Sequence, residues 1–134
     1  MSIAKSKFIV KHEALIVSLK AQYSTYGSFD SELELANSSI FPSIGVFLGV
    51  SSSNSEIIKY KPMTYSYILG VFDRIDLSNS SDALIKQKDL FSLIENIIET
   101  MGYRVVGDIE PLTEVAINEG SFISGWTVPI QFNA

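Results

Sequence analysis

The fold is decided by a 20-residue stretch, DALIKQKDLFSLIENIIETM, which runs from Asp82 to Met101. On a helical wheel its polar side chains take one half and its apolar ones the other, with Ile85 as the exception. Serine and aspartate oxygens before it can cap the N-terminus, and Gly102 stands where a left-handed residue ends a helix. A two-sided helix of this length, about 30 Å, needs an apolar surface to lie on. Its apolar members are Leu84, Leu90, Phe91, Leu93, Ile94, Ile97, Ile98 and Met101.

Strand-like runs on both sides of this stretch supply such a surface. Each run alternates apolar and polar residues or is apolar throughout, as strands with one or two buried faces are. Three precede the helix and two follow it, at 29–35, 41–50 and 63–76, then at 103–117 with a bend at proline, and at 122–132. Gly45 and Gly49 leave room for a close approach, most simply by a packed side chain or helix. Pro129 has no backbone N–H to donate to a neighbouring strand. The last strand therefore either lies at an edge of the sheet or has no hydrogen-bonded partner on the side that the Pro129 nitrogen faces.

A second helix is predicted from Ser6 to Tyr23, with apolar residues on two nearly opposite sides. One stripe holds mostly large side chains: Phe8, Ile9, His12, Leu15, Ile16, Leu19 and Tyr23. The other stripe holds smaller ones at 4-3-4 spacing: Val10, Ala14, Val17 and Ala21. A surface helix needs only one apolar face. Either one stripe packs on the sheet and the other on the Asp82–Met101 helix, or the small-residue stripe meets a neighbouring subunit.

The predicted order is therefore helix, three strands, helix, two strands. Consecutive strands can pair as antiparallel hairpins, and the two helices can cover one face of the sheet. We predict an α+β fold with an antiparallel or mixed sheet of about five strands and two main helices on one face. The 134 residues suit one domain, 1–134, and we find no internal repeat or long linker.

The composition excludes several classes of function. Hydrophobic residues make up 46% of the chain and charged ones 19%, which is typical of a folded domain. The absence of cysteine removes disulfides, thiolate catalysis and cysteine-ligated zinc. The net charge of −5 argues against a protein that coats nucleic acid. No apolar run reaches about 18 residues, and lysines interrupt the N-terminal segment, so we expect neither a membrane span nor a signal peptide.

Few residues are suited to chemistry, and we predict no catalytic, cofactor-binding or metal-binding residue. The single histidine, His12, lies on an apolar stripe, where a hydrogen-bonded structural role is favoured over a catalytic one. Four carboxylates could bind a hard cation if the strand ends that carry them converged. They are Asp73, Asp76, Asp108 and Glu110.

Two alternatives come from other classes of protein. One is a small enzyme that uses carboxylates such as Asp73, Asp76 or Glu110 in a deep pocket. The other is a monomeric binding module that uses a tyrosine-rich face of the sheet, since rows of tyrosine occur both in cross-strand packing and at interfaces. The tyrosines concerned are Tyr60, Tyr65 and Tyr67.

Three short strings, FPSIGVFL, Val71-Phe72 and Gly125-Trp126, occur in a particular order of elements. The string FPSIGVFL at 41–48 is followed by a polar loop, by a long strand that runs into Val71-Phe72 and by a helix. The closing strand begins at Gly125-Trp126 and alternates to Phe132. In this order the chain from Phe8 to Phe132 resembles the tail-terminator proteins of long-tailed bacteriophages. The loop at 51–61 departs from that family in length, which leaves open a related neck, connector, tail-completion or injection-machine subunit.

The resemblance implies a structural virion protein without catalysis. It implies a homo-oligomeric ring, commonly a hexamer, that caps the tail tube and joins it to the head. The implied partners are further copies of the chain, the tail-tube protein and the neck or head-completion proteins. DNA would pass through the lumen without specific binding, which an acidic subunit suits. The implied location is the tail or neck of the virion, after synthesis in the host cytoplasm.

A ring subunit needs two different patches that meet and close the ring. We predict that the small-residue stripe of the first helix forms part of a subunit contact: Val10, Ala14, Val17 and Ala21. We also predict that an extended loop or hairpin reaches the tail tube or a neighbour through Ile57, Ile58, Tyr60 and Met63.

Overall fold

The structure is a computed structural model that describes residues 4, 6–29, 41–52, 64–76, 80–118 and 121–133. The described elements, in chain order, are α1 (Lys7–Gln22), β1 (Gly27–Phe29), β2 (Ser43–Ser52), β3 (Thr64–Asp76), α3 (Ser80–Met101), β4 (Arg104–Val105), β5 (Glu110–Asn118) and β6 (Ser121–Asn133). The two predicted helices are confirmed, as are the strands predicted at 41–50, 63–76 and 122–132, with each end within two residues.

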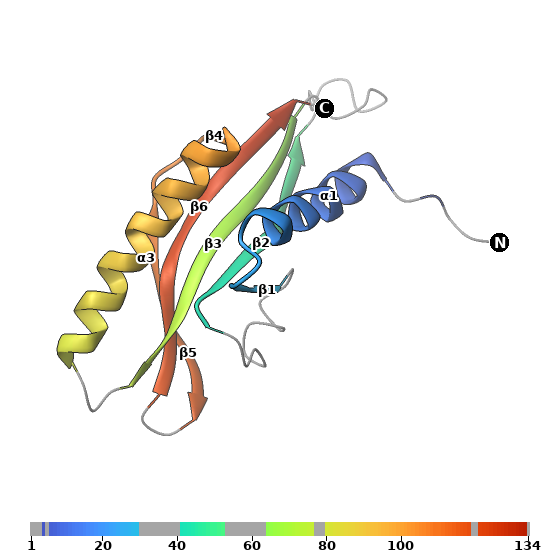
Figure 1. Cartoon of the computed structure of the whole chain (residues 1–134). Helices are drawn as coiled ribbons and strands as arrows, with labels where there is room; N and C mark the ends of the chain where they lie inside the picture. The colour runs from blue at the N-terminus through green and yellow to red at the C-terminus, as the bar shows by residue number, and fades with distance from the viewer. Residues whose placement is uncertain are drawn as a thin grey trace.

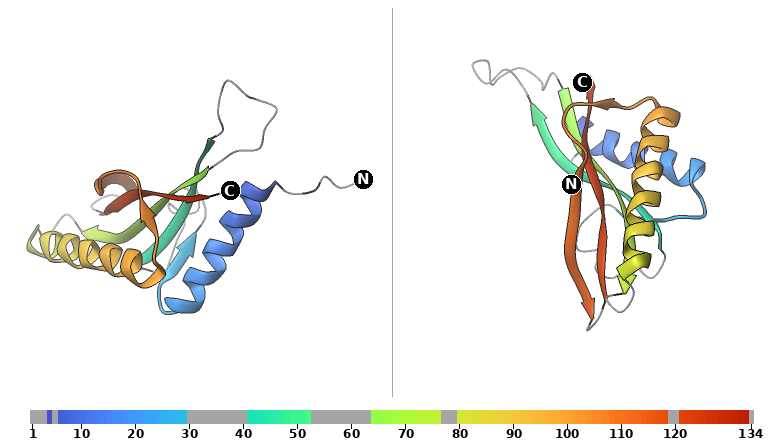
Figure 2. Two further views of the ribbon diagram at one scale, coloured as in Figure 1. Left: turned by 90° about the horizontal axis from the view of Figure 1, so that it is seen from above. Right: turned by 90° about the vertical axis from the view of Figure 1, so that its left-hand side faces the viewer.

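The described strands form one six-stranded sheet in the order β1-β2-β3-β6-β4, and β5 also pairs with β6. β1 runs parallel to β2, whereas every other pair is antiparallel. Both helices lie on the same face of the sheet (Figure 1), and a view from above shows the same layering (Figure 2). α1 packs over β2, and α3 packs over β3 and β6. The predicted α+β arrangement with two helices on one face is confirmed.

The larger core lies between the sheet and the helices. Within α3, Leu90, Ile94 and Ile97 recur every three or four residues and are at most 2% exposed. Alternate residues of β3 and β6 meet the helices, because successive side chains along a strand point to opposite faces. These strand residues are Tyr65, Tyr67, Leu69 and Val71 from β3, and Trp126, Val128, Ile130 and Phe132 from β6.

The helix ends follow the signals in the sequence. The Ser6 hydroxyl accepts a hydrogen bond from the backbone N–H of Ile9 at 3.2 Å, which caps α1. Gly102 has a φ of +67°, so it ends α3 in the left-handed conformation that glycine adopts without strain. The next N–H, of Tyr103, donates to the Ile98 carbonyl at 3.1 Å.

A smaller cluster occupies the other face of the sheet, where Phe47, Phe72 and Ile123 pack together. Gly49 also belongs to this part of β2, next to an irregularity in its pairing with β3. A Cβ atom at Gly49 would lie 2.5 Å from the backbone oxygen of Ser66. The close approach predicted at this glycine is therefore made by the backbone of β3, and the expectation of a packed side chain or helix was wrong.

The position of Pro129 distinguishes the two predictions for the last strand. β6 is not an edge strand, because β3 pairs with it on one side and β4 and β5 share its other side. The Pro129 carbonyl accepts from the N–H of Val106 at 3.1 Å, so its nitrogen also faces the β4–β5 side. There β4 has ended at Val105 and β5 begins at Glu110. Pro129, which lacks an N–H donor, thus lies opposite the gap between β4 and β5. This agrees with the prediction that the strand has no hydrogen-bonded partner on that side of Pro129.

Two predicted strands differ from the structure. The strand expected at 29–35 corresponds to β1, which ends at Phe29, and residues 30–35 lie outside the described residues. In the stretch from 103 to 109, only Arg104 and Val105 pair with β6. The following residues cross to β5, and a Cβ atom at Gly107 would lie 2.7 Å from Cγ of Pro129. The proline ring fills the space beside this crossover, which explains why the strand stops.

Candidate interaction surface

The small-residue stripe of α1 faces away from the core. Val17 is 67% exposed and Val10 is 51% exposed, and Ala14 and Ala21 are exposed as well. The interpretation that this stripe packs on the other helix is therefore wrong. α1 lies over β2, and a hydrogen bond from the Tyr23 hydroxyl to Asn96 Oδ1, at 2.8 Å, joins the two helices at the end of α1 rather than along the stripe.

The opposite side of α1 is held by polar and aromatic contacts. His12 Nε2 donates to the Val46 carbonyl at 2.6 Å, and the imidazole stacks on the Tyr67 ring with centroids 5.9 Å apart. The Tyr67 hydroxyl donates to the Phe8 carbonyl at 2.7 Å, and the Phe8 ring stacks on Tyr67 at 4.8 Å. Burial raises the pKa of Tyr67 to about 12, so its hydroxyl remains a donor at neutral pH. These contacts fix which side of α1 meets solvent.

The prediction of a buried, hydrogen-bonded His12 is confirmed. The side chain is 6% exposed, and its partner is a strand carbonyl. The pairing of β1 with β2 ends at Gly45, so the carbonyl of Val46 comes directly after the last residue that β1 reaches. The imidazole thus satisfies a backbone oxygen just beyond the end of β1.

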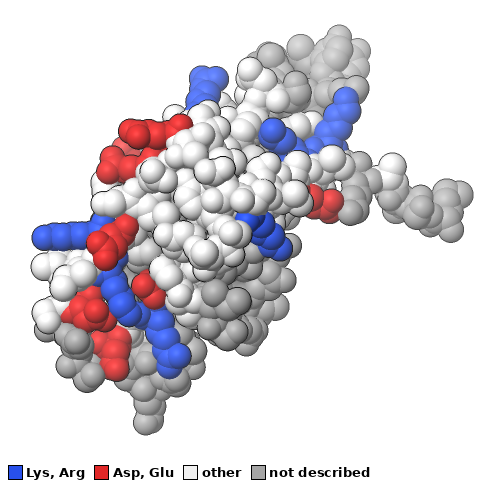
Figure 3. Space-filling view, in the orientation of Figure 1, with Lys and Arg blue, Asp and Glu red and all other residues white. Residues whose placement is uncertain are grey.

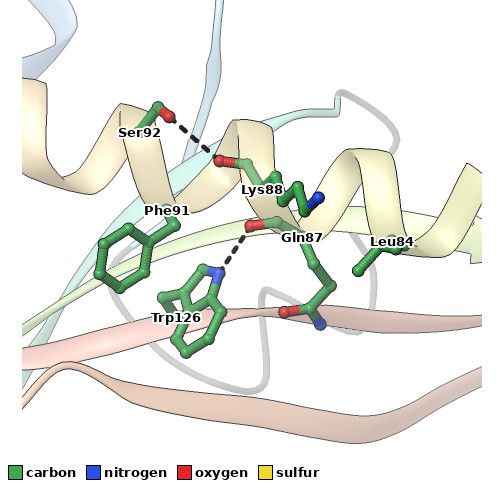
Figure 4. A pocket seen from close by; sticks show the side chains of 6 residues that line it. All are labelled: Leu84, Gln87, Lys88, Phe91, Ser92 and Trp126. Carbon is green, nitrogen blue, oxygen red and sulfur yellow. Dashed lines mark hydrogen bonds between the residues drawn. The ribbon is translucent and has the colours of Figure 1, made fainter.

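An apolar groove lies between α3 and β6 (Figure 4). Its volume is about 620 Å³, and its lining residues are Leu84, Gln87, Lys88, Phe91, Ser92 and Trp126. Trp126 Nε1 donates to the Gln87 carbonyl at 2.9 Å, and the Phe91 ring meets the indole edge-on with centroids 5.0 Å apart. The Gln87 side chain donates to the Ser124 hydroxyl. The indole is thus fixed in place, and Leu84, which is 59% exposed, stands at the mouth of the groove.

A second, more polar hollow of about 330 Å³ lies beside the middle of α3. Its lining includes Asp73, Lys86 and Asp89. Burial raises the pKa of Asp73, while the backbone N–H of Arg74 and the charge of Lys86 oppose that rise. Lys86 Nζ is already engaged, because it lies 3.3 Å from the Asp82 carboxylate and donates to the Arg74 carbonyl at 2.7 Å. The hollow therefore contains no spare positive charge from Lys86.

The carboxylates considered for a hard cation do not converge. Asp76 pairs with Ser121 and Glu110 pairs with Thr127, six positions further along β6. At about 3.4 Å per residue, these two positions are roughly 20 Å apart. Among the described residues, no group of three possible metal ligands lies close together. The condition for a cation site at these strand ends is therefore not met among the described residues.

The tyrosines considered for a binding face are covered where the structure describes them. Tyr65 is 7% exposed and Tyr67 is fully buried, and both belong to the core beneath the helices. The interpretation of these two residues as an open binding face is therefore wrong. Tyr60 and the other loop residues predicted to reach a partner lie outside the described residues. They are Ile57, Ile58, Tyr60 and Met63.

The sequence predicts the stripe on α1 but not the groove beside α3. Leu84, Phe91 and Trp126 all appear in apolar patterns, and those patterns predict burial for each of them. The groove depends on contacts between positions about 40 residues apart in sequence, from Gln87 to Trp126. The adjacent apolar residues Leu84 and Ile85 indicate from the sequence that at least one apolar side chain of this helix is exposed, since one helix face cannot bury both. In the structure both are 59% exposed.

Within the described residues, neither helix has an apolar stretch long enough to cross a bilayer. The stripe on α1 and the groove between α3 and β6 are two apolar surfaces of the described chain that remain open, and Leu48, Val105 and Val106 are exposed elsewhere on it. Comparison with the sequence profiles of known protein families finds no match, and comparison with curated protein sequences finds none either.

Proposed function

We propose that this chain is a structural subunit that assembles with copies of itself into a ring. We further propose that the ring caps a tail tube and joins it to a phage head, as in the tail-terminator proteins that the sequence resembles. The observation that carries the proposal is the exposed apolar stripe on α1. No catalytic role is part of the proposal.

The stripe supports assembly because the packing of the opposite side of α1 on the core keeps the stripe exposed. Burying one valine side chain stabilises a complex by about 1.5–3 kcal/mol relative to leaving it in water. α1 cannot rotate to bury Val10 and Val17 in its own core, because His12, Leu15 and Leu19 already occupy the inward side. The stripe is therefore available for contact with a second protein surface.

The charge of the chain agrees with a ring through which DNA passes. The sequence has 15 acidic residues and 10 basic ones, with a net charge of −5. Tight binding to phosphates requires a concentration of lysine and arginine that releases counterions. A ring of acidic subunits would let DNA move through its lumen without holding it.

Solution mass is the first test. Light scattering behind a sizing column, over a range of concentrations, should show a species near six times the 14.8 kDa of one chain. Negative-stain electron microscopy of that species should show rings with a central opening. If the chain is monomeric alone, adding the tail-tube protein encoded by the same genome should produce the ring.

Two variants separate assembly from folding. Val17→Glu places a charge in the stripe and should reduce the mass to that of one chain, with an unchanged circular dichroism spectrum. Ser18→Glu places the same charge on the adjacent exposed position and should assemble as the unmodified chain does. A chain that stays monomeric at every concentration, with and without tail tube, would show the proposal to be wrong. A ring that binds portal but not tail tube would instead indicate a neck or connector subunit.

A further inference from the structure

The stripe on α1 and the groove beside α3 lie on different sides of the molecule. Figure 1 shows α1 and α3 at opposite ends of the helical layer, with α3 beside β6 and α1 beside β2. We infer that the α1 stripe of one copy packs into the groove between α3 and β6 of the next copy. This inference rests on the proposed ring function and names the two surfaces that would meet.

Contact between unlike surfaces determines the kind of assembly. If the stripe of one copy met the stripe of another, the contact would be two-fold and would end at a dimer. A contact between stripe and groove leaves each copy with one unused surface of each kind. Copies then continue to add head to tail, which gives a closed ring when the rotation between successive copies closes and an open filament when it does not.

The stripe is a ridge and the surface beside α3 is a groove. From Val10 to Ala21 the stripe rises by eleven steps along the helix, which is about 16 Å at 1.5 Å per residue. The alternation of valine with alanine forms a low ridge, and the alanines allow another surface to approach the helix backbone closely. The groove presents Leu84 at its mouth and the Phe91 and Trp126 rings along its wall. Ridges that fit grooves are the ordinary way in which helices pack.

The charges of the two helices are also complementary. α1 has three lysines and one glutamate, whereas α3 has two lysines and four carboxylates. Lys7 and Lys20, both exposed, flank the stripe on its two sides. Glu95 and Glu99 continue the groove side of α3 at spacings of four residues from Phe91, and both are exposed. Figure 3 shows basic atoms and some acidic ones around α1, and acidic clusters interspersed with basic ones over α3.

This charge pattern favours a second copy of the chain as the occupant of the groove. A contact of α1 with α1 would bring together two helices of net positive charge, and α3 with α3 two of net negative charge. A contact of α1 with α3 brings a helix of net positive charge against one of net negative charge. Lys88, which lines the groove, and Glu13, which lies between Lys20 and the stripe, are the exceptions to this pattern. The α1 stripe and the groove between α3 and β6 are thus complementary surfaces of the same chain.

Disulfide cross-linking tests the contact directly, because the chain has no cysteine of its own. Ala14→Cys lies on the stripe and Ser92→Cys lines the groove. After mild oxidation of an equal mixture of the two variants, a covalent dimer of one variant with the other is expected on a non-reducing gel. The double variant should give a ladder of oligomers. Thr100→Cys, on an exposed part of α3 away from the groove, replaces Ser92→Cys in the control and should give no mixed dimer.

A mixing experiment gives an independent readout. Leu84→Glu should block the groove, and Val17→Glu should block the stripe, so each variant alone should have the mass of one chain. Their mixture should form dimers and nothing larger, because only one intact stripe can meet one intact groove. Ile85→Glu is the matched control: Ile85 is as exposed as Leu84, at 59%, but does not line the groove. This variant should assemble normally.

The outcomes separate this inference from the proposed function. If the unmodified chain forms rings while Leu84→Glu still assembles and no mixed cross-link forms, the inference is wrong and the ring function stands. Cross-links only between two Ala14→Cys chains would show a two-fold contact and overturn both. A chain that never assembles, alone or with tail tube, would also overturn both.

Discussion

The two helices cover the same face of one sheet, yet they are held there by different means. α3 is held by aliphatic burial, since Leu90, Ile94 and Ile97 are almost wholly inaccessible. α1 buries only two aliphatic side chains, Leu15 and Leu19, and relies in addition on the hydrogen bonds of His12 and Tyr67 and on stacked rings. A helix held by directed contacts on one side can keep apolar residues on its other side. The two helices thus present their apolar surfaces differently: α1 on the side opposite its core contacts, and α3 in the groove that it forms with β6.

The largest effect should come from the aliphatic anchor of α3. Ile94 is fully buried, so Ile94→Ala removes buried methyl groups and leaves a cavity, and it should lower the free energy of unfolding by about 2–5 kcal/mol. Urea denaturation measures this loss. Ile85→Ala, on the exposed side of the same helix, should change stability by no more than about 0.5 kcal/mol. Equal losses for the two variants would contradict the assignment of α3 to the core.

The polar anchor of α1 should have the next largest effect. His12→Ala leaves the buried Val46 carbonyl without its partner, which costs about 1–3 kcal/mol. His12→Gln keeps an N–H donor and should recover part of that loss. Urea denaturation of both variants measures the difference. Identical losses would indicate that the histidine acts through its volume and not through its hydrogen bond.

Alkaline pH should weaken the contacts beneath both helices. Burial raises the pKa values of Tyr67 and Tyr103 to about 12, from an ordinary value near 10. The folded chain therefore retains protons that the unfolded chain releases, so this stabilisation is complete below pH 10 and is lost as the pH rises towards 12. Urea denaturation at pH 8 and pH 11 should show a smaller alkaline loss in Tyr67→Phe than in the unmodified chain. Equal losses would contradict the assignment to Tyr67.

The smallest effect on stability should come from the α1 stripe. Val17→Glu alters a side chain that is 67% exposed, so the free energy of unfolding of the single chain should change by no more than about 0.5 kcal/mol. Its effect should appear in solution mass alone. A large loss of stability in the monomer would mean that Val17 supports the fold, and the contrast between the two helices would then be weaker than we describe.

The sequence predicts most of the fold because the periodic patterns are long. The wheel of α3 separates Leu90, Ile94 and Ile97 from polar residues, and the structure buries all three. The wheel of α1 shows two stripes, but it does not show which of them meets the sheet. Packing decides that question, because the larger stripe contains the ring of Phe8 and the imidazole of His12, which fit against Tyr67.

The candidate surfaces were only partly predictable for a related reason. A wheel gives the direction of each side chain but not the place where the neighbouring layer ends. Leu84 shares the apolar half of α3 with Phe91, yet it remains exposed at the mouth of the groove. The hydrogen bond of Trp126 to Gln87 joins two elements that no local pattern relates. The groove is thus a property of tertiary packing.

The contact between Gly107 and Pro129 constrains the alignment of β6 with the strands on its β4–β5 side. A slip of β6 by two residues would keep every side chain on its own face, so hydrophobic patterning alone does not prevent it. Such a slip would place Thr127 or Gln131 beside Gly107 and would move Pro129 opposite β4 or β5, where a ladder N–H is required. The pyrrolidine ring of Pro129 fits beside a glycine, and Pro129 has no backbone N–H to donate. Both properties therefore favour the observed register of β6. They select one of several alignments that the apolar pattern would accept equally.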